Sequence, residues 1–335
     1  MKKSTKVIIV LDILVAICFF LVYGPITYIK NTIISTALVT KTHQYIAYTF
    51  YSKKTVQKVM QKDSYIPFDE NVNLNNIVID TSPKDSYDNP YDEQILTRDG
   101  NNNDYKVIEL EVGGYKAFLV AIYDPSKVKL ATSPSFNNNK KGSERMINMC
   151  ERLGGLVCIN GGGFKDPDGW GSDIPRGYLI KDGKVIWSDN NKKANLIGFT
   201  TDNKLLLTNA TGEEAIEEGM RDALEFGPFL IVNGEQIKFN DTAGGYNRAA
   251  RVAIGQRKDG VVLFLVTEGV HANGPRLIEV ASTLAQYGAI NAANLDGGSS
   301  AQLVINNKLV NNPLNVAGKP IKNGRKVVSG FILMP

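Results

Sequence analysis

The sequence predicts an α+β fold: a strand-rich mixed sheet core flanked by a few helices, preceded by one transmembrane helix and a helical stalk. Three observations support this prediction. Residues 7–29 are apolar apart from one aspartate. From residue 105 onward, short alternating apolar runs are separated by Asp-Gly and Asn-Gly turns, which are typical of hairpins. Only two segments of that second region have helical periodicity. The predicted domains are therefore residues 1–30 (cytoplasmic tip and anchor), 31–104 (helical stalk and linker) and 105–335 (strand-rich domain).

The N-terminal apolar run has the length of a membrane span. Its 23 residues, at about 1.5 Å each, match a hydrocarbon core of about 30 Å. Asp12 lies near one end, within reach of the headgroups, and Gly24-Pro25 is expected to kink the helix or end it early. A cleaved signal peptide is the alternative, but no Ala-x-Ala-like site follows the run. Three lysines precede it, which predicts a single-pass anchor with a cytoplasmic N-terminus and the remaining chain outside.

Residues 31–104 separate the anchor from the strand-rich region. Residues 31–62 contain no glycine or proline and carry an apolar stripe, which predicts the helical stalk. Residues 63–104 are rich in proline, aspartate and asparagine, which predicts a linker or an irregular wrap over the domain surface.

The charge balance excludes a nucleic-acid-binding footprint. Without the three lysines and one aspartate of the first 29 residues, the 38 basic and 34 acidic side chains become 35 and 33, a net charge of +2. No basic stripe interleaved with aromatic residues is present. With 43% apolar and 21% charged residues, the composition is that of a globular protein.

The three cysteines do not resemble a disulfide scaffold. Cys18 lies inside the predicted anchor, so only Cys150 and Cys158 could pair. Cys158 stands in the apolar run 156–159, and the favoured interpretation is a small buried core residue. A bridge between the two is the alternative.

The strand-rich region has nine clear strand candidates and two helix candidates. The predicted strands are 107–112, 115–122, 177–180, 185–187, 197–200, 205–208, 229–232, 252–255 and 261–266. One helix is expected from a cap at Ser143 to Leu153. The other is expected from Pro275, which suits a first turn, to Tyr287, with Gly288 ending it.

Each predicted helix is followed by the same plan: glycine, a short apolar strand, an Asn or Asp, then more glycines. The first copy spans residues 154–164 and contains Asn160. The second spans residues 288–298 and contains Asn294 and Asp296. We hypothesise that the two glycine-rich strand ends converge on one pocket.

Asp296 is the strongest candidate for a functional residue. It ends a run of small and apolar residues, and Gly297 and Gly298 follow at once, so a substrate could approach its carboxylate closely. The alternative is an ordinary Asp-Gly hairpin turn. The matching segment around Asn160 favours a site over a plain turn.

Further polar residues stand beside predicted strands. Arg248 and Arg251 precede a buried strand, where an arginine could clamp a phosphate or form a strand-end ion pair. Glu268 follows the strand 261–266 and could be a site carboxylate or a turn glutamate. His271 could be a loop residue or an acid–base group.

No cofactor is predicted, and calcium is the one ion left open. Residues 166–173 contain three aspartates, but they lack the spacing and terminal glutamate of an EF-hand. Trp170 in that loop could instead stack on a sugar face. The chain contains no His-x-x-x-His or Cys-x-x-Cys zinc site, no Gly-x-Ser-x-Gly elbow and no Walker loop.

Four segments together resemble a known family. Residues 160–164, 226–234, 251–255 and 294–300 occur in the order found in phosphodiester glycosidases, and the resemblance covers residues 105–335. This is the family of N-acetylglucosamine-1-phosphodiester α-N-acetylglucosaminidase, the mannose-6-phosphate uncovering enzyme. The anchor and residues 40–45 also resemble its membrane-attached bacterial branch, whose members are often labelled exopolysaccharide-biosynthesis proteins of the cell envelope.

The resemblance implies that residues 105–335 are a catalytic domain that hydrolyses a sugar-1-phosphodiester in a cell-surface glycan or related polymer outside the membrane. It implies that Asp296 is the nucleophile or base, that Glu268 is a second carboxylate, and that Arg251 holds the phosphate. The substrate-binding residues that it implies are Asn160, Gly161, Gly162, Arg248, Asn294, Gly297, Gly298 and Ser299.

Two departures from the family pattern leave the substrate open. The family usually has Asp-Gly-Arg where this chain has Glu268-Gly-Val270, and Gly-Gly-Gly-Ser is common where this chain has Gly297-Gly-Ser299. The alternatives are a non-catalytic glycan-binding or polysaccharide-assembly module, or a transferase that passes the sugar or phosphate to another acceptor. The expected partners are a phosphate-linked glycan and the membrane.

Overall fold

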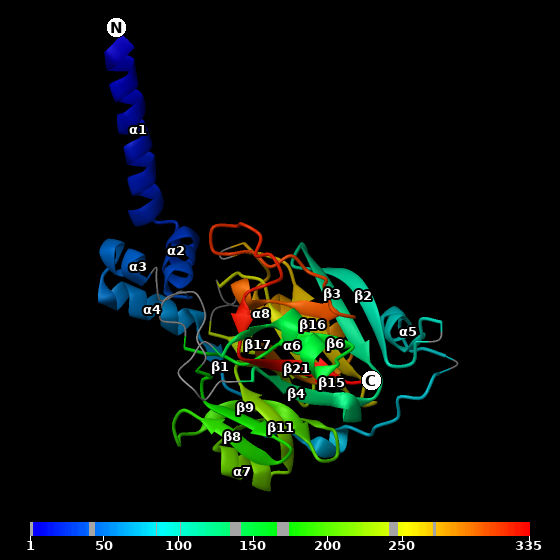
Figure 1. Cartoon of the computed structure of the whole chain (residues 1–335). Coiled ribbons are helices and arrows are strands. Elements are labelled where there is room, and N and C mark those ends of the chain that lie inside the picture. The colour runs from blue at the N-terminus through cyan, green and yellow to red at the C-terminus, as the bar shows by residue number, and fades with distance from the viewer. Residues whose placement is uncertain are drawn as a thin grey trace. The chain divides into compact units, whose positions relative to one another are not determined.

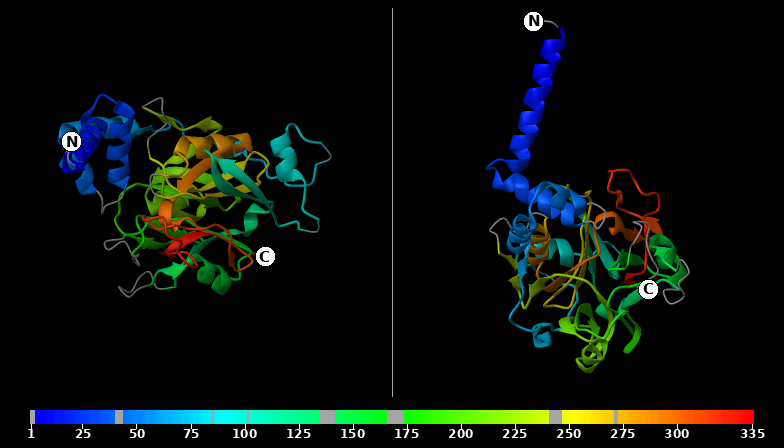
Figure 2. Two further views of the ribbon diagram at one scale, coloured as in Figure 1. Left: turned by 90° about the horizontal axis from the view of Figure 1, so that it is seen from above. Right: turned by 90° about the vertical axis from the view of Figure 1, so that its left-hand side faces the viewer.

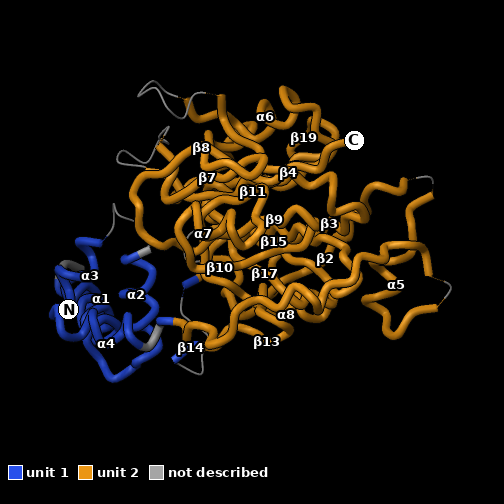
Figure 3. The backbone as a smooth tube through the Cα atoms, turned by 90° about the horizontal axis from the view of Figure 1, so that it is seen from below, with its two compact units in different colours: residues 1–64, 239–247 blue, residues 65–238, 248–335 orange. Residues whose placement is uncertain are grey.

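The computed structural model describes residues 3–39, 44–84, 86–100, 102–134, 142–165, 174–240, 247–270 and 273–335. The chain forms two compact units, coloured separately in Figure 3: residues 1–64 with 239–247, and residues 65–238 with 248–335. Residues 40–43, the loop 166–173 with Trp170, and His271 lie outside the described residues.

The first unit begins with an apolar helix, α1 (Lys3–Tyr23). Its segment Thr5–Tyr23 has 19 residues and a mean hydropathy of 2.7. Among the described helices it is the one that is long and apolar enough to cross a membrane, by length and composition. It ends immediately before Gly24-Pro25, as the sequence predicts.

The predicted stalk is divided into separate helices. They are α2 (Thr27–Val39), α3 (Gln44–Phe50) and α4 (Lys53–Asp63). Ser52 starts α4, because its hydroxyl accepts a hydrogen bond from the Thr55 N–H at 3.2 Å. The apolar stripe of this region forms a small core in which Ile34, Ala47 and Val56 are buried.

Three sheets form the second unit (Figure 1). The seven-stranded sheet has the order β13 (Glu235–Gln236), β12 (Phe229–Val232), β17 (Ala289–Leu295), β15 (Val252–Arg257), β16 (Val262–Thr267), β3 (Tyr115–Ile122) and β2 (Tyr105–Val112). One five-stranded sheet has the order β19 (Lys308–Leu309), β18 (Leu303–Ile305), β6 (Val157–Asn160), β21 (Ser329–Leu333) and β4 (Val128–Thr132). The other has the order β10 (Leu205–Ala210), β9 (Ala194–Thr200), β11 (Met220–Glu225), β7 (Tyr178–Lys181) and β8 (Lys184–Ser188).

The remaining elements are short or lie outside these sheets. Two-residue strands are β1 (Tyr65–Ile66), β5 (Glu144–Arg145), β14 (Lys238–Phe239) and β20 (Lys326–Val327). The α-helices are α5 (Pro90–Leu96), α6 (Met146–Leu153), α7 (Gly212–Glu217) and α8 (Leu277–Gln286). The 3₁₀ turns are η1 (Leu74–Asn76), η2 (Pro125–Lys127) and η3 (Gly298–Ser300).

One apolar core connects the three sheets. Strands β15 and β16 are buried along their whole length, and rings of two five-stranded sheets meet where Phe199 packs edge-on against Phe331, with centroids 6.1 Å apart. Helix α8 packs on β17 and β12, and α6 packs on β6 and β18. The views of Figure 2 show these two helices on opposite sides of the layered sheets. The predicted α+β class is confirmed.

The structure differs from the sequence prediction in three local respects. All strand pairs given for the three large sheets in the described part of the chain are antiparallel, where mixed sheets were expected. Helix α6 begins after Arg145, because Glu144 and Arg145 pair with β20 as a strand, so Ser143 is not its cap. Strands β4, β11, β18 and β21 were not predicted.

Cys150 and Cys158 form a disulfide, so the interpretation of Cys158 as an unpaired core residue was wrong. Cys150 lies on the buried face of α6, and the chain reverses at Gly154, whose φ is +75°. The reversal places β6 against the helix that precedes it, with the two Cα atoms 5.9 Å apart. The sequence separation of eight residues therefore spans a helix end and a strand start.

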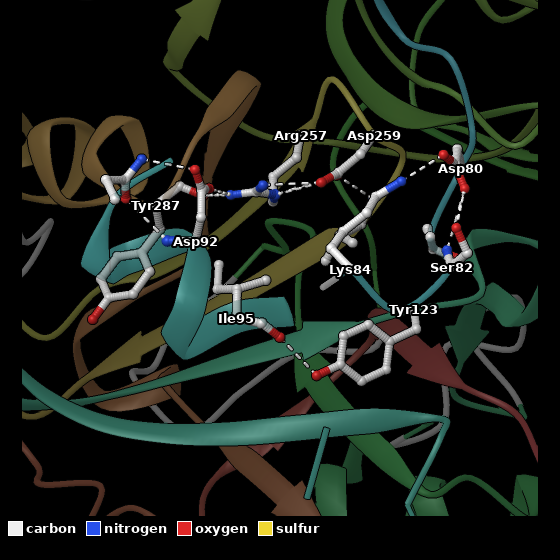
Figure 4. Close-up of polar contacts among 12 residues, drawn as sticks. Asp80, Ser82, Lys84, Asp92, Ile95, Tyr123, Arg257, Asp259 and Tyr287 are labelled. Carbon is white, nitrogen blue, oxygen red and sulfur yellow. Dashed lines mark hydrogen bonds and ion pairs between the residues drawn. The ribbon is translucent and has the colours of Figure 1, made fainter. Parts of the chain in front are cut away.

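Within the second unit, a segment here called the strap packs against the hairpin of β15 and β16 (Figure 4). The strap consists of residues 77–84 and 86–98. The Val78 and Asp80 N–H groups each donate to a carbonyl of that hairpin at 2.9 Å. Arg257 is 4% exposed and forms ion pairs with Asp92 at 2.8 Å and Asp259 at 2.9 Å. The strap thus supplies a counter-charge to a buried arginine of the sheet.

The strap also covers Tyr123, which follows β3. The Tyr123 hydroxyl donates to the Ile95 carbonyl at 2.8 Å (Figure 4). The Arg98 guanidinium lies 3.1 Å from the centroid of the Tyr123 ring. Burial raises the pKa of Tyr123 to about 12. In this part of the predicted linker or surface wrap, hydrogen bonds, an ion pair and a cation–π contact therefore hold the chain against the seven-stranded sheet.

Candidate active site

The two glycine-rich strand ends meet at the junction of two sheets. Strand β6 ends at Asn160 and β17 ends just before Asp296. The Asn160 side-chain Nδ2 donates to the Asp296 carbonyl at 2.6 Å, and the Asp296 N–H donates to the Gly161 carbonyl at 2.8 Å. Two segments 136 residues apart are thereby joined directly, which agrees with the hypothesis that these strand ends converge.

The Asp296 segment is not a hairpin. After β17 the chain passes through η3 and enters β18, which pairs with β6 and β19 of the other sheet. A Cβ atom on Gly297 would lie 2.5 Å from the Ala250 carbonyl oxygen, and Gly298 has a φ of +57° and donates to the same carbonyl at 2.7 Å. The close approach requires a glycine at 297 and the positive φ favours one at 298, and the turn leaves Asp296 and Ser299 half-buried.

The antiparallel register places three predicted site residues at one edge of the seven-stranded sheet. Val252 pairs with Leu295 on one side and with Val266 on the other. Arg251 therefore precedes β15 at the edge where Asp296 follows β17 and where Glu268 follows β16. Adjacent strands are about 4.8 Å apart, so the backbones at Asp296 and Glu268 are about 10 Å apart, with Arg251 between them.

Arg251 is the most constrained of these side chains. It is 7% exposed, its N–H donates to the Thr267 hydroxyl at 2.9 Å, and its Nε donates to the Pro275 carbonyl at 3.3 Å. Arg248 is half-buried, and its Nη1 donates to the Gly274 carbonyl at 3.2 Å. Both arginines thus hold the segment that leads into α8.

Glu268 is held at the sheet edge through both its backbone and its side chain. Its N–H donates to the Lys116 carbonyl at 2.7 Å, and its Oε1 accepts from the Asn312 N–H at 3.1 Å. The side chain is half-buried. One oxygen of this carboxylate therefore fixes the loop at Asn312.

Asn294 offers a buried acceptor at the same strand end. Its N–H donates to the Pro228 carbonyl at 3.0 Å and its Nδ2 donates to the Gly227 carbonyl at 2.9 Å. Its Oδ1 has no hydrogen-bond partner among the described residues, although the side chain is only 4% exposed. A buried oxygen without a partner can accept a hydrogen bond from a hydroxyl group of a ligand.

The backbone amides of the loops are occupied within the protein. The Gly161 N–H donates to the Ser329 carbonyl at 3.0 Å, the Gly162 N–H donates to the Ser329 hydroxyl at 3.3 Å, and the Gly298 N–H is used by Ala250. These three N–H groups therefore already have acceptors within the protein. Their glycines serve close packing: a side chain on Gly161 would overlap Leu224.

A pocket of about 240 Å³ lies beside these strand ends and was not predicted. It is lined by Gly163, Arg176, Asn195, Glu225, Phe226 and Gly227. Burial, and secondarily the charge of Asp189, raises the pKa of Glu225, while the Arg176 charge opposes the shift. The available signal was a glutamate directly before the segment 226–234, but it was missed because β11, which ends at Glu225, was not recognised as a strand.

The described residues of the site include no cluster of metal ligands. In the described ranges no group of three or more His, Cys, Asp or Glu side chains could hold a metal ion. The calcium-loop candidate at 166–173 lies outside those ranges. The described groups that the site can offer to a ligand are therefore carboxylates, arginines and side-chain amides at the edge of a sheet.

The profile of the family described as phosphodiester glycosidase matches residues 154–334, more than half of the chain. The chain belongs to the phosphodiester glycosidase family. Membership supports a hydrolase activity of the glycosidase type, and the matched region contains Asn160, Glu225, Arg251, Glu268 and Asp296.

Related proteins show how far this family assignment extends. The mouse N-acetylglucosamine-1-phosphodiester alpha-N-acetylglucosaminidase is 25% identical over 174 residues, which is 47% of this chain and 33% of that protein. The SPbeta prophage-derived uncharacterized protein YomE of Bacillus subtilis (strain 168) is 27% identical over 201 residues, which is 57% of this chain and 30% of that protein. The chain thus spans about a third of the length of the curated relatives it matches.

A solved structure supports the fold. The zebrafish N-acetylglucosamine-1-phosphodiester alpha-N-acetylglucosaminidase catalytic domain, auto-inhibited by its pro-peptide, superposes with a TM-score of 0.59 at 20% sequence identity. The match covers 72% of this chain and 87% of that one. The family resemblance predicted from four short segments is confirmed.

The raised pKa of Glu225 predicts a pH-dependent effect of the substitution Glu225→Gln on stability. The folded state keeps the carboxyl proton to a higher pH than the unfolded chain, whose glutamates titrate near 4.5. The folded state therefore binds more protons just above that value, and this carboxyl lowers the free energy of unfolding as pH rises through the interval. Glutamine removes the titration, so the melting temperature of the variant minus that of the wild type should be larger at pH 7 than at pH 4. An equal difference at both pH values would contradict a buried, destabilised carboxylate.

Proposed function

We propose that the protein hydrolyses a sugar-1-phosphodiester, the glycosidic bond to a phosphate, in a cell-surface glycan or related polymer outside the membrane. The observation that carries the proposal is the single sheet edge at which Asp296, Arg251 and Glu268 are gathered in a chain of this family. A carboxylate and an arginine are the two groups that cleavage of such a bond requires on its two sides.

The residues suit the two halves of the reaction. Departure of the phosphate gives the anomeric carbon oxocarbenium character, and the Asp296 carboxylate stabilises or attacks that carbon, or takes the proton of the attacking water. The C1–O bond breaks, the water hydroxyl is added to C1, and the phosphate leaves as a monoester. Arg251 binds the phosphate as its charge increases, and Arg248 supports the same segment.

The remaining residues position the reacting groups. Asn160 holds the Asp296 main chain through its side-chain amide, and the unpartnered Asn294 Oδ1 accepts a sugar hydroxyl. Glu268 is the second carboxylate, and the hydrogen bond that it accepts from the Asn312 N–H fixes it at the edge. A phosphate is already a good leaving group, so a strong general acid is less necessary than for an ordinary glycoside.

Asp296→Asn is the direct test of the catalytic assignment. The full chain in detergent micelles is incubated with an N-acetylglucosamine-1-phosphodiester, and release of the free sugar is followed. Loss of the carboxylate should lower kcat by at least about 100-fold, since the group acts in the transition state. Asp182→Asn is the matched control: Asp182 also precedes a glycine, in the β7–β8 turn at a φ of +50°, and this variant should keep wild-type activity.

Each remaining outcome of this assay has a defined meaning. Wild-type turnover in Asp296→Asn would contradict the role of Asp296. A wild-type protein that binds the phosphodiester without cleaving it would replace the enzyme with a glycan-binding module. Transfer of the sugar to an added alcohol in preference to water would indicate a transferase.

We further propose that α1 anchors the protein in the cell membrane, with its N-terminus cytoplasmic and the second unit extracellular. The 19-residue segment Thr5–Tyr23 is long enough to span a membrane, and the three lysines at the N-terminal end of α1 favour this orientation. The Cys150–Cys158 disulfide supports it independently, because disulfides persist in oxidising compartments and are rare in the cytosol.

Thiol counting in intact cells tests this location. Cells are quenched with acid, denatured and treated with a polyethylene-glycol maleimide. One adduct per chain, at Cys18, is expected without reductant and three after reduction, because Cys150 and Cys158 are paired. The Cys18→Ser variant should give no adduct without reductant and two adducts per chain after reduction. Three adducts without reductant would place the domain in a reducing compartment and contradict the proposal.

A further inference from the structure

The geometry points to a monosaccharide-binding subsite formed by Glu225, Arg176 and Phe226 beside the Asp296 strand end. We propose that this subsite takes the neutral sugar ring of the substrate and that Glu225 and Arg176 determine which sugar is accepted. The inference rests on the proposed hydrolysis of a sugar-1-phosphodiester and assigns one part of that substrate to a defined pocket.

The pocket is continuous with the candidate active site. It shares Gly163 with the loop that follows Asn160, and it shares Gly227 with the loop that Asn294 holds at 2.9 Å. The Gly163 N–H donates to the Glu225 carbonyl at 3.3 Å, and the Arg176 N–H donates to the Gly163 carbonyl at 2.9 Å. One short loop therefore connects both charged pocket residues to the strand end that contacts Asp296.

The fold makes specific room for the Glu225 carboxyl group. Gly177, between Arg176 and β7, has a φ of +57°, and a Cβ atom built on it would overlap Glu225 Oε2. Strands β11 and β7 are paired up to Leu224 and Leu179, so the two residues lie at the same end of that pair. A glycine in a conformation that other residues rarely adopt thus leaves space for this acid.

Both charged groups are available to a ligand. Within the described residues, neither the Glu225 carboxyl group nor the Arg176 guanidinium forms a hydrogen bond or an ion pair with another side chain or with the backbone. The half-buried Phe226 ring adds an apolar surface that packs over Gly163, whose Cβ would lie 3.4 Å from the ring. Acceptors, donors and an apolar face are the groups that bind a sugar ring.

The charges of the pocket favour a neutral ligand over a phosphate. Among the described residues that line it, Arg176 is the one cation, while Glu225 also lines it and Asp189 lies close enough to raise the pKa of Glu225. An anion would be repelled by two carboxylates for each guanidinium, whereas sugar hydroxyls can donate to the carboxyl group and accept from Arg176 and Asn195. The phosphate is therefore assigned to Arg251 and the sugar to this pocket.

The size of the pocket suits one sugar ring. Its volume of about 240 Å³ corresponds to about eight water molecules at roughly 30 Å³ each. That space suits a single monosaccharide unit. The remainder of the polymer would then lie on the phosphate side of the scissile bond.

The test measures binding separately from turnover. Ligand-observed NMR on the full chain in detergent micelles titrates N-acetylglucosamine, glucose, galactose and mannose, with inorganic phosphate as the anionic probe. At least one sugar should bind to the wild type, and Glu225→Gln and Arg176→Ala should each weaken it by about 10-fold or more, the loss of one charge-assisted hydrogen bond. Glu235→Gln, which alters an exposed carboxylate outside the pocket, should leave binding unchanged.

Measuring KM and kcat on the N-acetylglucosamine-1-phosphodiester distinguishes a residue that binds the sugar from one that only stabilises the fold. Glu225→Gln should raise KM by about 10-fold and change kcat by less than about twofold, because the residue binds the ring equally in the ground and transition states. Thermal unfolding of the same samples verifies that the variants are folded. Asp296→Asn should abolish turnover and keep sugar binding within about threefold of the wild type.

These outcomes separate failure of the subsite from failure of the proposed function. Glu225-dependent sugar binding without any hydrolysis would uphold the subsite and contradict the hydrolase. The subsite is overturned if none of the four sugars binds, if binding is unaffected by both pocket variants, or if inorganic phosphate binds and is lost in Arg176→Ala. It is also overturned if Glu225→Gln lowers kcat while KM stays at the wild-type value.

Discussion

The two hydrogen bonds of the Asn160 side chain, to the Asp296 carbonyl and from the Gln302 N–H, are the contacts on which the site depends. Asn160 is 1% exposed, and both ends of its amide are used: Nδ2 donates to the Asp296 carbonyl at 2.6 Å, and Oδ1 accepts from the Gln302 N–H at 2.9 Å. One side chain thus ties the end of β6 to the segments before and after η3. Loss of either function would leave a buried polar group unpaired, at a cost of about 1–3 kcal/mol.

Close backbone packing makes this junction possible. Gly297 lies against the Ala250 carbonyl, and Gly161 lies against Leu224 and Gly330, so neither position has room for a side chain. The chain can therefore leave one sheet and enter the other within a few residues, and the carboxylate of Asp296 is presented where two sheets meet. The same antiparallel register brings Arg251 and Glu268 to that edge, although Glu268 is separated from Asp296 by 28 residues of chain.

The features that the sequence predicted well have local causes. Strands joined by Asp-Gly or Asn-Gly turns, such as β7 and β8, follow from an alternating pattern and a turn that needs positive φ at Asp182 and Gly183. The end of α1 follows from Gly24-Pro25, and the two glycine-rich strand ends follow from a repeated local plan. The family was recognisable because four short segments keep their order along the chain.

The features that were missed have causes distant in the sequence. The Cys150–Cys158 bridge depends on how α6 folds back onto β6, which spacing alone does not specify. The N–H groups of Gly161 and Gly162 donate to Ser329, which is 167 residues from Gly162, and no local pattern around these glycines indicates that partner. Glu225 was missed because β11 has no tight turn to mark it. Its pocket is completed only when Arg176 approaches from the bend before β7 and Asn195 from β9.

The central claim is that Asn160 positions Asp296, and the most direct measurement is the hydrolysis rate of Asn160→Asp. Aspartate keeps the shape of the side chain and the acceptor for the Gln302 N–H, but it places a carboxylate oxygen against the Asp296 carbonyl where an N–H stood. We predict a fall in kcat of at least about 10-fold on the N-acetylglucosamine-1-phosphodiester. Asn306→Asp, which alters an amide that donates to the Tyr105 hydroxyl away from the site, should keep wild-type activity. A wild-type rate in Asn160→Asp would contradict the account.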